Sequence, residues 1–370
     1  MITDEQLIWI AILECPGIGV MTFNELLKRL DLVGITPLQF WDLSENEIKA
    51  LNLLRVSVQV FILHRQNFSI KKLKAELLQK NIAVLLKKDD QYPALLKHAP
   101  DAPPVLFIQG ILRERFSLPI AVVGTRQITS YGRVVTKLLT TELVQQGCEI
   151  ISGFMYGVDA VAHQAALEAN GYTVGVLGYG FDFCFPEYHL KLQHLLLEKG
   201  GALITEYLPT QPPVRGLFPQ RNRIVAGMSK GILVTEAAAD SGSKITARCA
   251  AEYGRDVFAI PGSITSKYSD GTKDLVNIGA KLVTSSQDIL IDYFPRMSEK
   301  SGNINTQAIM SQAETETEKR VLELLLGQSL SSDEIAEELQ LMLSELLTAV
   351  SALELKGIIL SERGKYSVIL

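Results

Sequence analysis

The sequence has few cysteines and no long apolar segment. Its four cysteines, Cys15, Cys148, Cys184 and Cys249, form no C-x-x-C pair, so neither a zinc site nor a disulfide framework is indicated. Dispersed cysteines are typical of a reducing cytoplasm. No apolar run is long enough to span a bilayer, and the first residues lack the basic segment of a signal peptide. We expect a cytoplasmic protein with no membrane segment, metal or cofactor.

The chain also lacks a strongly basic character. It carries 36 Lys and Arg against 41 Asp and Glu, a net charge of −5. From residue 316 onward ten acids stand against five bases, which gives −5 for this segment alone. The rest of the chain is therefore neutral overall. This balance is compatible with a local basic groove and excludes a strongly basic, sequence-blind footprint for nucleic acid.

A chain of 370 residues is long enough for two or three domains. Residues 1–85 are predicted to form short helices, because their apolar residues repeat at helical spacing. The pattern is interrupted at Pro16-Gly17-Ile18-Gly19 and resumes at Phe23–Leu30. This outline fits a helix-hairpin-helix domain whose turn touches a DNA phosphate. It also fits a plain helical hairpin, since no basic helix follows the turn.

Residues 86–290 show a different pattern, in which short β-branched runs alternate with helical stretches at intervals of roughly 25 residues. This indicates an α/β fold, an extended Rossmann-like, doubly wound and mostly parallel sheet. Such sheets bind ligands beyond the carboxyl ends of their strands, near a switch in strand order. The predicted strands are Ile120–Val123, Glu149–Ile151, Thr173–Leu177, Ala202–Thr205, Gly231–Thr235 and Val257–Ile260.

Residues 291–315 have the composition of a linker, and residues 316–370 are predicted to form a winged helix. The third helix of that domain carries two glutamates and one terminal lysine, which argues against a major-groove reader. A protein-contact or autoinhibitory role is favoured instead. The predicted elements are helices Glu318–Leu326, Ser332–Leu339 and Ser344–Lys356, N-caps Ser332 and Ser344, and a two-stranded wing over Gly357–Leu360 and Tyr366–Val368.

The clearest ligand-binding signal is Gly124-Thr125-Arg126, which ends the strand Ile120–Val123 and leads into a helix. Strand, glycine, hydroxyl residue and arginine are typical of a loop that holds an anion through backbone N–H groups and a guanidinium. The second glycine of the dinucleotide fingerprint is missing. We expect Arg126 to contact phosphate with help from the Thr125 and Thr129 hydroxyls. The alternative is an ordinary turn with a solvated arginine.

Two more loops extend this pattern. Phe218-Pro219-Gln220-Arg221-Asn222-Arg223 supplies two arginines, and Ser241–Ala247 supplies Lys244 after a strand end. Several phosphate sites exceed the needs of one mononucleotide and suit an extended polyanion, with Phe218 available to stack a base. The alternative for Lys244 is a solvated loop lysine.

Ser152, Asp159 and His163 do not form a convincing catalytic triad. There is no G-x-S-x-G elbow, and Asp159 and His163 lie four residues apart on one predicted helix. We expect Asp159 in the first turn of that helix and His163 packed in the core.

These motifs resemble those of the DNA-processing protein A family (DprA, also called Smf), in the same order over roughly residues 90–285. The resemblance implies a protein that is not an enzyme. Such a protein binds and protects single-stranded DNA, forms a homodimer, and loads RecA recombinase during natural transformation. The matching stretches are Tyr92-Pro93, Gly124-Thr125-Arg126, Ser152-Gly153 through His163, Phe218–Arg223, Ser241–Ala247, Pro261-Gly262 and Gly271-Thr272.

The resemblance implies that the helical domain of residues 1–85 is SAM-like. It also places DNA contacts on the motif loops and a dimer interface on the late edge of the sheet. Apolar residues at that edge could equally belong to the core. Departures from the family pattern include Lys244, Lys273 and Phe185-Pro186-Glu187-Tyr188-His189, and both lysines add positive charge. The candidate DNA-binding residues are Gly124, Thr125, Arg126, Thr129, Ser152, Gly153, Phe218, Arg221, Asn222, Arg223, Ser243, Lys244, Thr246 and Lys273. The candidate interface residues are Leu275, Ile278 and Leu282.

Two other classes of function compete with DNA binding. Rossmann-like phosphoribohydrolases process nucleotides with a P-G-G-x-G-T-x-x-E loop, but the nearest stretch, Ser241–Thr246, lacks the paired glycines and the glutamate. A protein-interaction scaffold without DNA binding is the other alternative.

Overall fold

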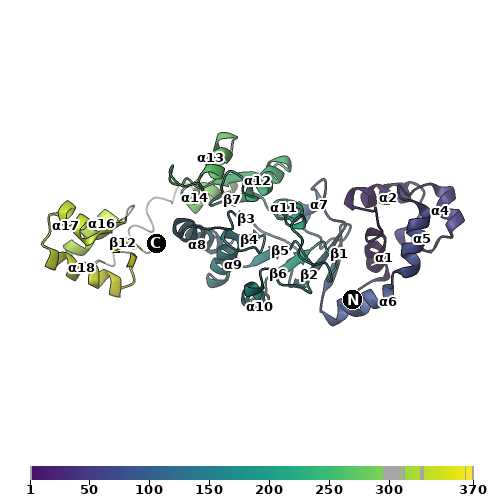
Figure 1. Ribbon diagram of the computed structural model, residues 1–370, viewed down its shortest axis with the longest axis horizontal. Coiled ribbons are helices and arrows are strands. Elements are labelled where there is room, and N and C mark those ends of the chain that lie inside the picture. Colours follow the sequence, from purple (N-terminus) through teal and green to yellow (C-terminus); the bar gives the residue numbers. More distant parts are fainter. Residues whose placement is uncertain (1, 295–309, 311–312, 326–328, 363, 369–370) are drawn as a thin grey trace. The chain divides into compact units, whose positions relative to one another are not determined.

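The computed structural model describes residues 2–294, 310, 313–325, 329–362 and 364–368. The chain divides into two compact units, Met1–Ser286 and Gln287–Leu370 (Figure 1). Within the described residues no helix is long and apolar enough to cross a membrane.

The first unit begins with helices that pack around buried aromatic and aliphatic side chains. Thr3, Thr36 and Ser44 each start a helix with a reciprocal capping box. The predicted turn at Pro16–Gly19 is present between the first two helices, and Gly17 adopts φ 87°, which favours glycine. The helices are α1 (Asp4–Leu13), α2 (Val20–Leu32), α3 (Pro37–Asp42), α4 (Glu45–Leu51), α5 (Val58–Asn67) and α6 (Ile70–Gln79).

The same unit contains a nine-stranded sheet in the order β1-β2-β6-β5-β4-β3-β7-β8-β9. In this order the strands from β6 through β9 are all parallel to one another. The pairs β1–β2 and β2–β6 are antiparallel. The predicted α/β fold class and the six central strands are confirmed; β1, β2 and β9 were not predicted. The strands are β1 (Ala83–Leu86), β2 (Val105–Gly110), β3 (Pro119–Val123), β4 (Glu149–Ser152), β5 (Thr173–Val176), β6 (Ala202–Thr205), β7 (Gly231–Val234), β8 (Asp256–Ala259) and β9 (Lys281–Leu282).

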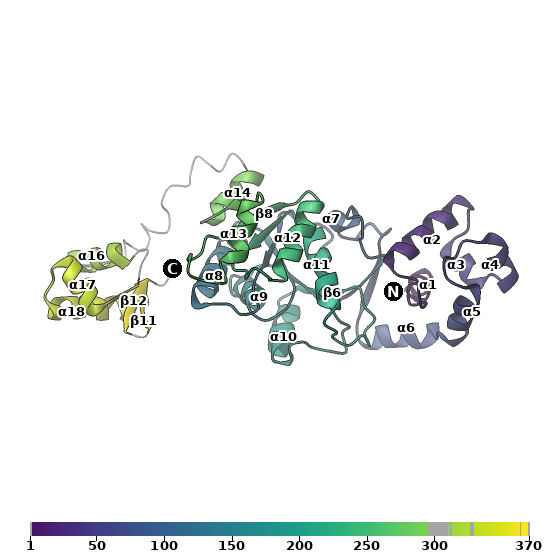
Figure 2. The same cartoon turned by 45° about the horizontal axis from the view of Figure 1, so that its top comes forward.

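Helices cover both faces of the sheet, with α8, α9 and α10 on one face and α11, α12 and α13 on the other (Figures 1 and 2). The residues of β6 show the alternation, since Leu203 joins one apolar cluster while Ala202 and Ile204 join the other. A sheet covered on both faces explains why β3 to β7 are buried throughout. The helices are α7 (Ala94–Lys97), α8 (Ser130–Gln145), α9 (Val158–Glu168), α10 (Leu190–Glu198), α11 (Leu217–Gly227), α12 (Ser243–Glu252) and α13 (Asp270–Asn277).

The second unit has the helices and the wing expected of a winged helix. The N-caps were predicted wrongly, because α17 is capped by Ser331 and α18 follows Met342. Most of the predicted linker 291–315 lies outside the described residues. The linker was predicted to start at residue 291, but α14 continues to Tyr293. The elements are α14 (Ser286–Tyr293), α16 (Glu316–Leu325), β10 (Leu330–Ser331), α17 (Ser332–Leu339), α18 (Leu343–Leu355), β11 (Ile359–Glu362) and β12 (Lys365–Val368).

Candidate nucleic-acid interface

The strand order of the sheet reverses at β3, which pairs with β4 on one side and with β7 on the other. The loops that leave β3 and β7 touch at this switch point, where Thr125 N donates to Glu236 O over 2.7 Å. Gly124 permits the contact, since a Cβ there would lie 2.7 Å from the same oxygen. The motif loops therefore meet where open α/β sheets bind ligands.

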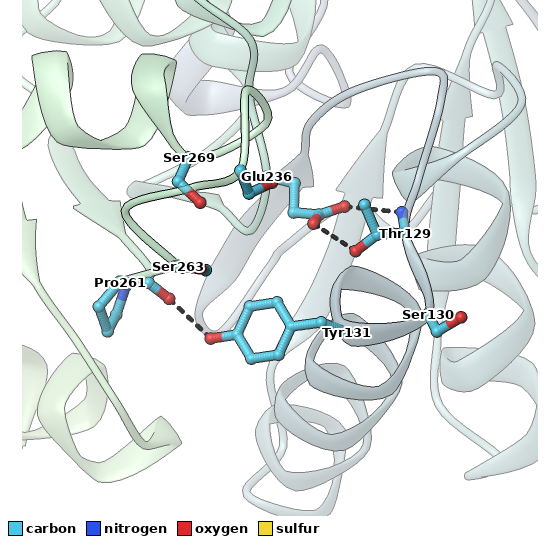
Figure 3. Close-up of a pocket in the computed structure, with 9 residues that line it drawn as sticks. Thr129, Ser130, Tyr131, Glu236, Pro261, Ser263 and Ser269 are labelled. Atoms are coloured by element: carbon cyan, nitrogen blue, oxygen red, sulfur yellow. Dashed lines mark hydrogen bonds between the residues drawn. The ribbon is translucent and has the colours of Figure 1, made fainter. Parts of the chain in front are cut away.

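The side chain of Glu236 lies against the N-terminus of α8. Its carboxylate accepts hydrogen bonds from Thr129 N (2.9 Å) and Thr129 Oγ1 (2.6 Å) (Figure 3). A Cβ at Gly132 would lie 2.0 Å from Glu236 Oε2, so only glycine leaves room for the carboxylate. A carboxylate at this position is stabilised by the helix dipole. The structure thus places an internal carboxylate where the sequence predicted a phosphate held by the Thr129 hydroxyl.

Arg126 is an exposed cation of this region. Its guanidinium lies 5.8 Å from the ring centroid of Tyr156 and 5.7 Å from that of Phe218. Among the described residues it forms no ion pair. The adjacent Thr125 is buried, and its Oγ1 accepts a hydrogen bond from Gln127 N (3.1 Å). Arg126 is therefore the member of the Gly124-Thr125-Arg126 motif that can reach a ligand.

Arg221 lies in the interior of the protein and not on the surface predicted for it. Only 2% of the residue is exposed, and its Nη1 donates to the backbone oxygens of Gly153 and Val176. Burial lowers the pKa of Arg221 to about 10, although Asp159 opposes the shift. Burial raises the pKa of Asp159 to about 6, and Arg221 again opposes it. Arg221 thus supports the Gly153 loop from below.

The neighbouring Arg223 is also occupied. Its Nη2 forms an ion pair with Glu206 Oε2 at 2.5 Å, and its Nε lies 3.8 Å from Asp101 Oδ2. The Arg223 side chain is 14% exposed. Asn222 Nδ2 donates to Gly242 O over 3.2 Å. The two predicted arginines of α11 therefore brace the surrounding loops, because each is held by internal acceptors.

Several other predicted contacts turn out to be structural in this conformation. Ser152 is buried and its Oγ donates to Val122 O (2.7 Å), while Ser243 and Thr246 are buried at the start of α12. Phe218 is 6% exposed, so its ring is not available as an open stacking surface. The half-buried Tyr156, which the sequence motifs did not single out, is more accessible.

The two candidate lysines lie on adjacent helices. Lys244 Nζ forms an ion pair with Asp274 Oδ2 at 2.8 Å and donates to Ala239 O at 2.9 Å. Lys273 is exposed. Lys273 therefore keeps an exposed positive charge, whereas the charge of Lys244 is partly neutralised by Asp274.

Ser152, Asp159 and His163 do not assemble a triad. His163 is buried in α9 and its Nδ1 lies 2.7 Å from Thr173 Oγ1, while Ser152 Oγ donates to a backbone carbonyl. Asp159 lies in the first turn of α9, as expected. The described part of the chain also contains no group of three or more His, Cys, Asp or Glu side chains able to hold a metal ion.

The predicted interface residues divide into two groups. Leu275 is 4% exposed and belongs to the apolar core between the sheet and its helices, so its predicted place on a surface is wrong. Ile278 is 79% exposed and Leu282 is 50% exposed. These two apolar side chains remain available to a partner at the late edge of the sheet.

Fold and site together define a Rossmann-like α/β protein that presents an arginine beside aromatic rings at the switch point of its sheet. The family model of DNA recombination-mediator protein A matches residues 83–294, and the DprA winged helix domain matches residues 308–365. The chain therefore belongs to the DprA/Smf family.

Relatives and solved structures agree with this assignment. Protein Smf of Escherichia coli (strain K12) is 44% identical over 212 residues, 57% of each chain, so the match spans little more than half of that protein. DNA processing protein DprA of Streptococcus pneumoniae (strain R6) is 43% identical over 55% of this chain and 72% of its own.

Among solved structures, DprA from Streptococcus pneumoniae gives a TM-score of 0.66 at 34% identity, covering 78% of this chain and 98% of that one. DNA processing protein A from Helicobacter pylori gives a TM-score of 0.51 at 28% identity, over 58% and 96% of the two chains. The latter structure is described in terms of its single-stranded DNA binding mode.

Proposed function

We propose that this protein binds single-stranded DNA with little sequence preference along the carboxyl ends of β3 to β7. The observation that carries the proposal is Arg126, an exposed guanidinium beside Tyr156 with no ion pair among the described residues. Cations that track the backbone and aromatic rings that stack bases are the features by which proteins hold a single strand. The description of the Helicobacter pylori relative supports the same ligand.

In this proposal Arg126 contacts a phosphate and Tyr156 offers its ring to a base. Lys273, and Lys244 at its margin, extend the positive charge. Gly124 allows the loops after β3 and β7 to approach each other closely. The residues that shape these loops are Thr125, Thr129, Ser152, Gly153, Ser243 and Thr246. The residues of α11 do not contact DNA directly in this proposal. They stabilise the loops that carry the contacts, through Phe218, Arg221, Asn222 and Arg223. Phosphate contacts position a strand without reading its bases.

We further propose that the protein protects incoming strands and loads RecA recombinase onto them in the cytoplasm during natural transformation. Membership of a family named for mediating DNA recombination supports this role. Ile278 and Leu282 are the proposed centre of a homodimer interface. A direct test measures RecA filament assembly on DNA covered by a single-strand-binding protein, with and without this protein. No acceleration of assembly would refute the loading role.

The alternative, a nucleotide-processing enzyme, has less support. The loop before α12 lacks the glycines and glutamate of phosphoribohydrolases, and Glu236 fills the N-terminus of α8. Incubation with nucleoside monophosphates should release no free base. Release of base would restore the enzymatic alternative.

The DNA-binding proposal is tested by fluorescence anisotropy with a labelled single strand. Arg126→Ala should weaken binding about tenfold, or about 1.4 kcal/mol, with an unchanged melting temperature because the side chain is exposed. Arg115→Ala is the matched control, since Arg115 is exposed and precedes β3 at the opposite edge of the sheet. An unchanged affinity of Arg126→Ala, or tighter binding of duplex than of single strands, would contradict the proposal.

A further inference from the structure

Asp159 is a buried carboxylate beneath the loops proposed to bind the strand. It is 8% exposed and lies in the first turn of α9. Met155 N donates to its Oδ2 over 3.3 Å, and among the described residues it forms no ion pair. The guanidinium of Arg221, which flanks Gly153 together with Asp159, donates to backbone carbonyls instead. Burial of a charge without a direct partner is unfavourable, which favours the protonated form of this carboxyl.

The helix that carries Asp159 is attached to the backbone of the Arg126 loop. Val158 N donates to Thr125 O over 3.2 Å. A Cβ at Gly157 would lie 2.7 Å from Arg126 Cα, so the turn before α9 packs directly against this backbone. Asp159 is therefore held at a fixed position relative to Arg126.

Two opposing effects set the pKa of Asp159. Burial raises it to about 6, and the positive charges of Arg221 and Arg126 oppose the rise. A phosphate that contacts the Arg126 guanidinium adds a negative charge on that side and offsets the effect of Arg126 on the carboxylate. The phosphate therefore favours the protonated carboxyl.

The other titratable groups around Asp159 are the two buried imidazoles and one carboxylate. His163 lies one turn further along α9 and His189 lies just before α10, and burial lowers the pKa of both. Both imidazoles are therefore neutral at pH 7. On the side of β7, the carboxylate of Glu236 is engaged by Thr129. Of the Asp159, His163 and His189 side chains, only that of Asp159 has a raised pKa.

We infer that Asp159 takes up a proton when a phosphate of the strand contacts Arg126, so that strand binding is coupled to pH. The proton comes from the solvent, is held by a carboxylate oxygen, and returns to the solvent when the strand dissociates. Asp159 does not touch the strand. In the free protein its negative charge balances the guanidinium groups, and in the complex the phosphate does so. This inference rests on the proposed binding of single-stranded DNA and adds a residue that regulates it.

The first test measures the affinity for a dT strand at pH 8 and at pH 6 by fluorescence anisotropy. Thymine and phosphodiesters do not titrate in this range, so a change in affinity reports on the protein. Because the coupling is reciprocal, the proton should strengthen strand binding, by about fivefold at pH 6 relative to pH 8 for charges separated by partly buried surroundings. A flat wild-type profile would overturn the inference and leave the proposed function intact. Failure to bind at either pH would overturn both.

Two variants assign the pH dependence to one carboxyl. Asp159→Asn should remove it, because an amide takes up no proton in this range, and thermal melts verify that the variant is folded. Glu168→Gln is the matched control, since it makes the same kind of change at the exposed end of α9, and it should keep the pH dependence. A pH dependence that survives in Asp159→Asn, or that is lost in both variants, would overturn the inference.

A measurement on the wild type does not depend on the stability of the Asp159 variant. Isothermal titration calorimetry with the dT strand at pH 7, in two buffers with different enthalpies of ionisation, gives the number of protons exchanged on binding. The wild type should take up protons, and Arg126→Ala should take up fewer, because no phosphate is then held near Asp159. No uptake by the wild type, or an unchanged uptake by Arg126→Ala, would overturn the inference.

Discussion

The guanidinium of Arg221 and the carboxylate of Asp159 flank the space left by the missing side chain of Gly153. A Cβ at Gly153 would lie 2.7 Å from Arg221 Nη2 and 2.5 Å from Asp159 Oδ2. Both charged residues are buried. The loop after β4 therefore depends on a glycine, because any larger residue would clash with two buried charges that stabilise each other electrostatically.

Arg221→Met should destabilise the fold by about 3–5 kcal/mol, the usual cost of leaving a buried charge without its partner. Urea unfolding followed by circular dichroism measures the change. The double variant Arg221→Met/Asp159→Asn should recover part of the loss, because no charge is then left unpaired. If the loss of stability in the double variant equals the sum of the losses in Arg221→Met and Asp159→Asn, the two residues are not coupled.

His163 should make the fold sensitive to acid. Burial lowers its pKa to about 3, with smaller contributions from His189 and Arg221. Because this folded-state pKa lies below the unfolded value of about 6.5, the associated stability is present above pH 6.5. It is lost as the pH falls toward 3, by about 2 kcal/mol at pH 5.

The variant His163→Asn checks this assignment. It should be less stable than the wild type at pH 7 and should lose less stability between pH 7 and pH 5. Urea unfolding gives the free energy of unfolding of both proteins as a function of pH. The difference between the two curves removes the contributions of Asp159 and the other titrating groups that the proteins share. Parallel profiles over this range would assign the acid sensitivity to other residues.

Binding of a single strand should weaken with salt. With roughly four phosphate contacts, the slope of log affinity against log salt is expected to be about −3, at about 0.7 per phosphate. Arg126→Ala should make the slope less negative by about 0.7, because one contact is lost. Anisotropy titrations at several salt concentrations give both slopes. A flat salt response would exclude phosphate contacts as the source of affinity.

Ile278→Arg should convert the proposed homodimer into a folded monomer. A two-fold interface repeats each residue about its axis, so the substitution would place two charges in the apolar interface proposed at Ile278. Light scattering after size exclusion gives the mass, and Leu63→Arg is the control on an exposed apolar residue of α5. A dimer that survives Ile278→Arg, or a wild type that is already monomeric, would remove this edge as the interface.

Ending the chain after Asp292 should leave single-strand affinity unchanged or raise it. The segment from residue 316 carries a net charge of −5, which repels a polyanion at long range. Anisotropy with the truncated and full chains provides the comparison, with thermal melts to verify folding. A fall of tenfold, about 1.4 kcal/mol, would show that the winged helix contributes DNA contacts.

The local sequence was sufficient to predict the central strands of the sheet. The six strands from β3 to β8 follow β-branched runs, because a strand buried on both faces needs apolar residues throughout. The exposed position of Arg126 next to a strand end also follows from its motif. By contrast, β9 has only Lys281 and Leu282, too short a run to carry a strand signal.

Only the tertiary structure decided which polar residues face outward. Glu236 lies 107 positions from Thr129 and still fills the N-terminus of α8, and Arg221 lies 68 positions from the carbonyl of Gly153 that it binds. Leu275 follows an amphipathic pattern that suits either a core or an interface, and packing placed it in the core. The amino-acid sequence itself determined where loops with anion-binding chemistry occur, because that chemistry belongs to neighbouring residues. Which of their charges are already neutralised depends on partners that are close only after the chain has folded.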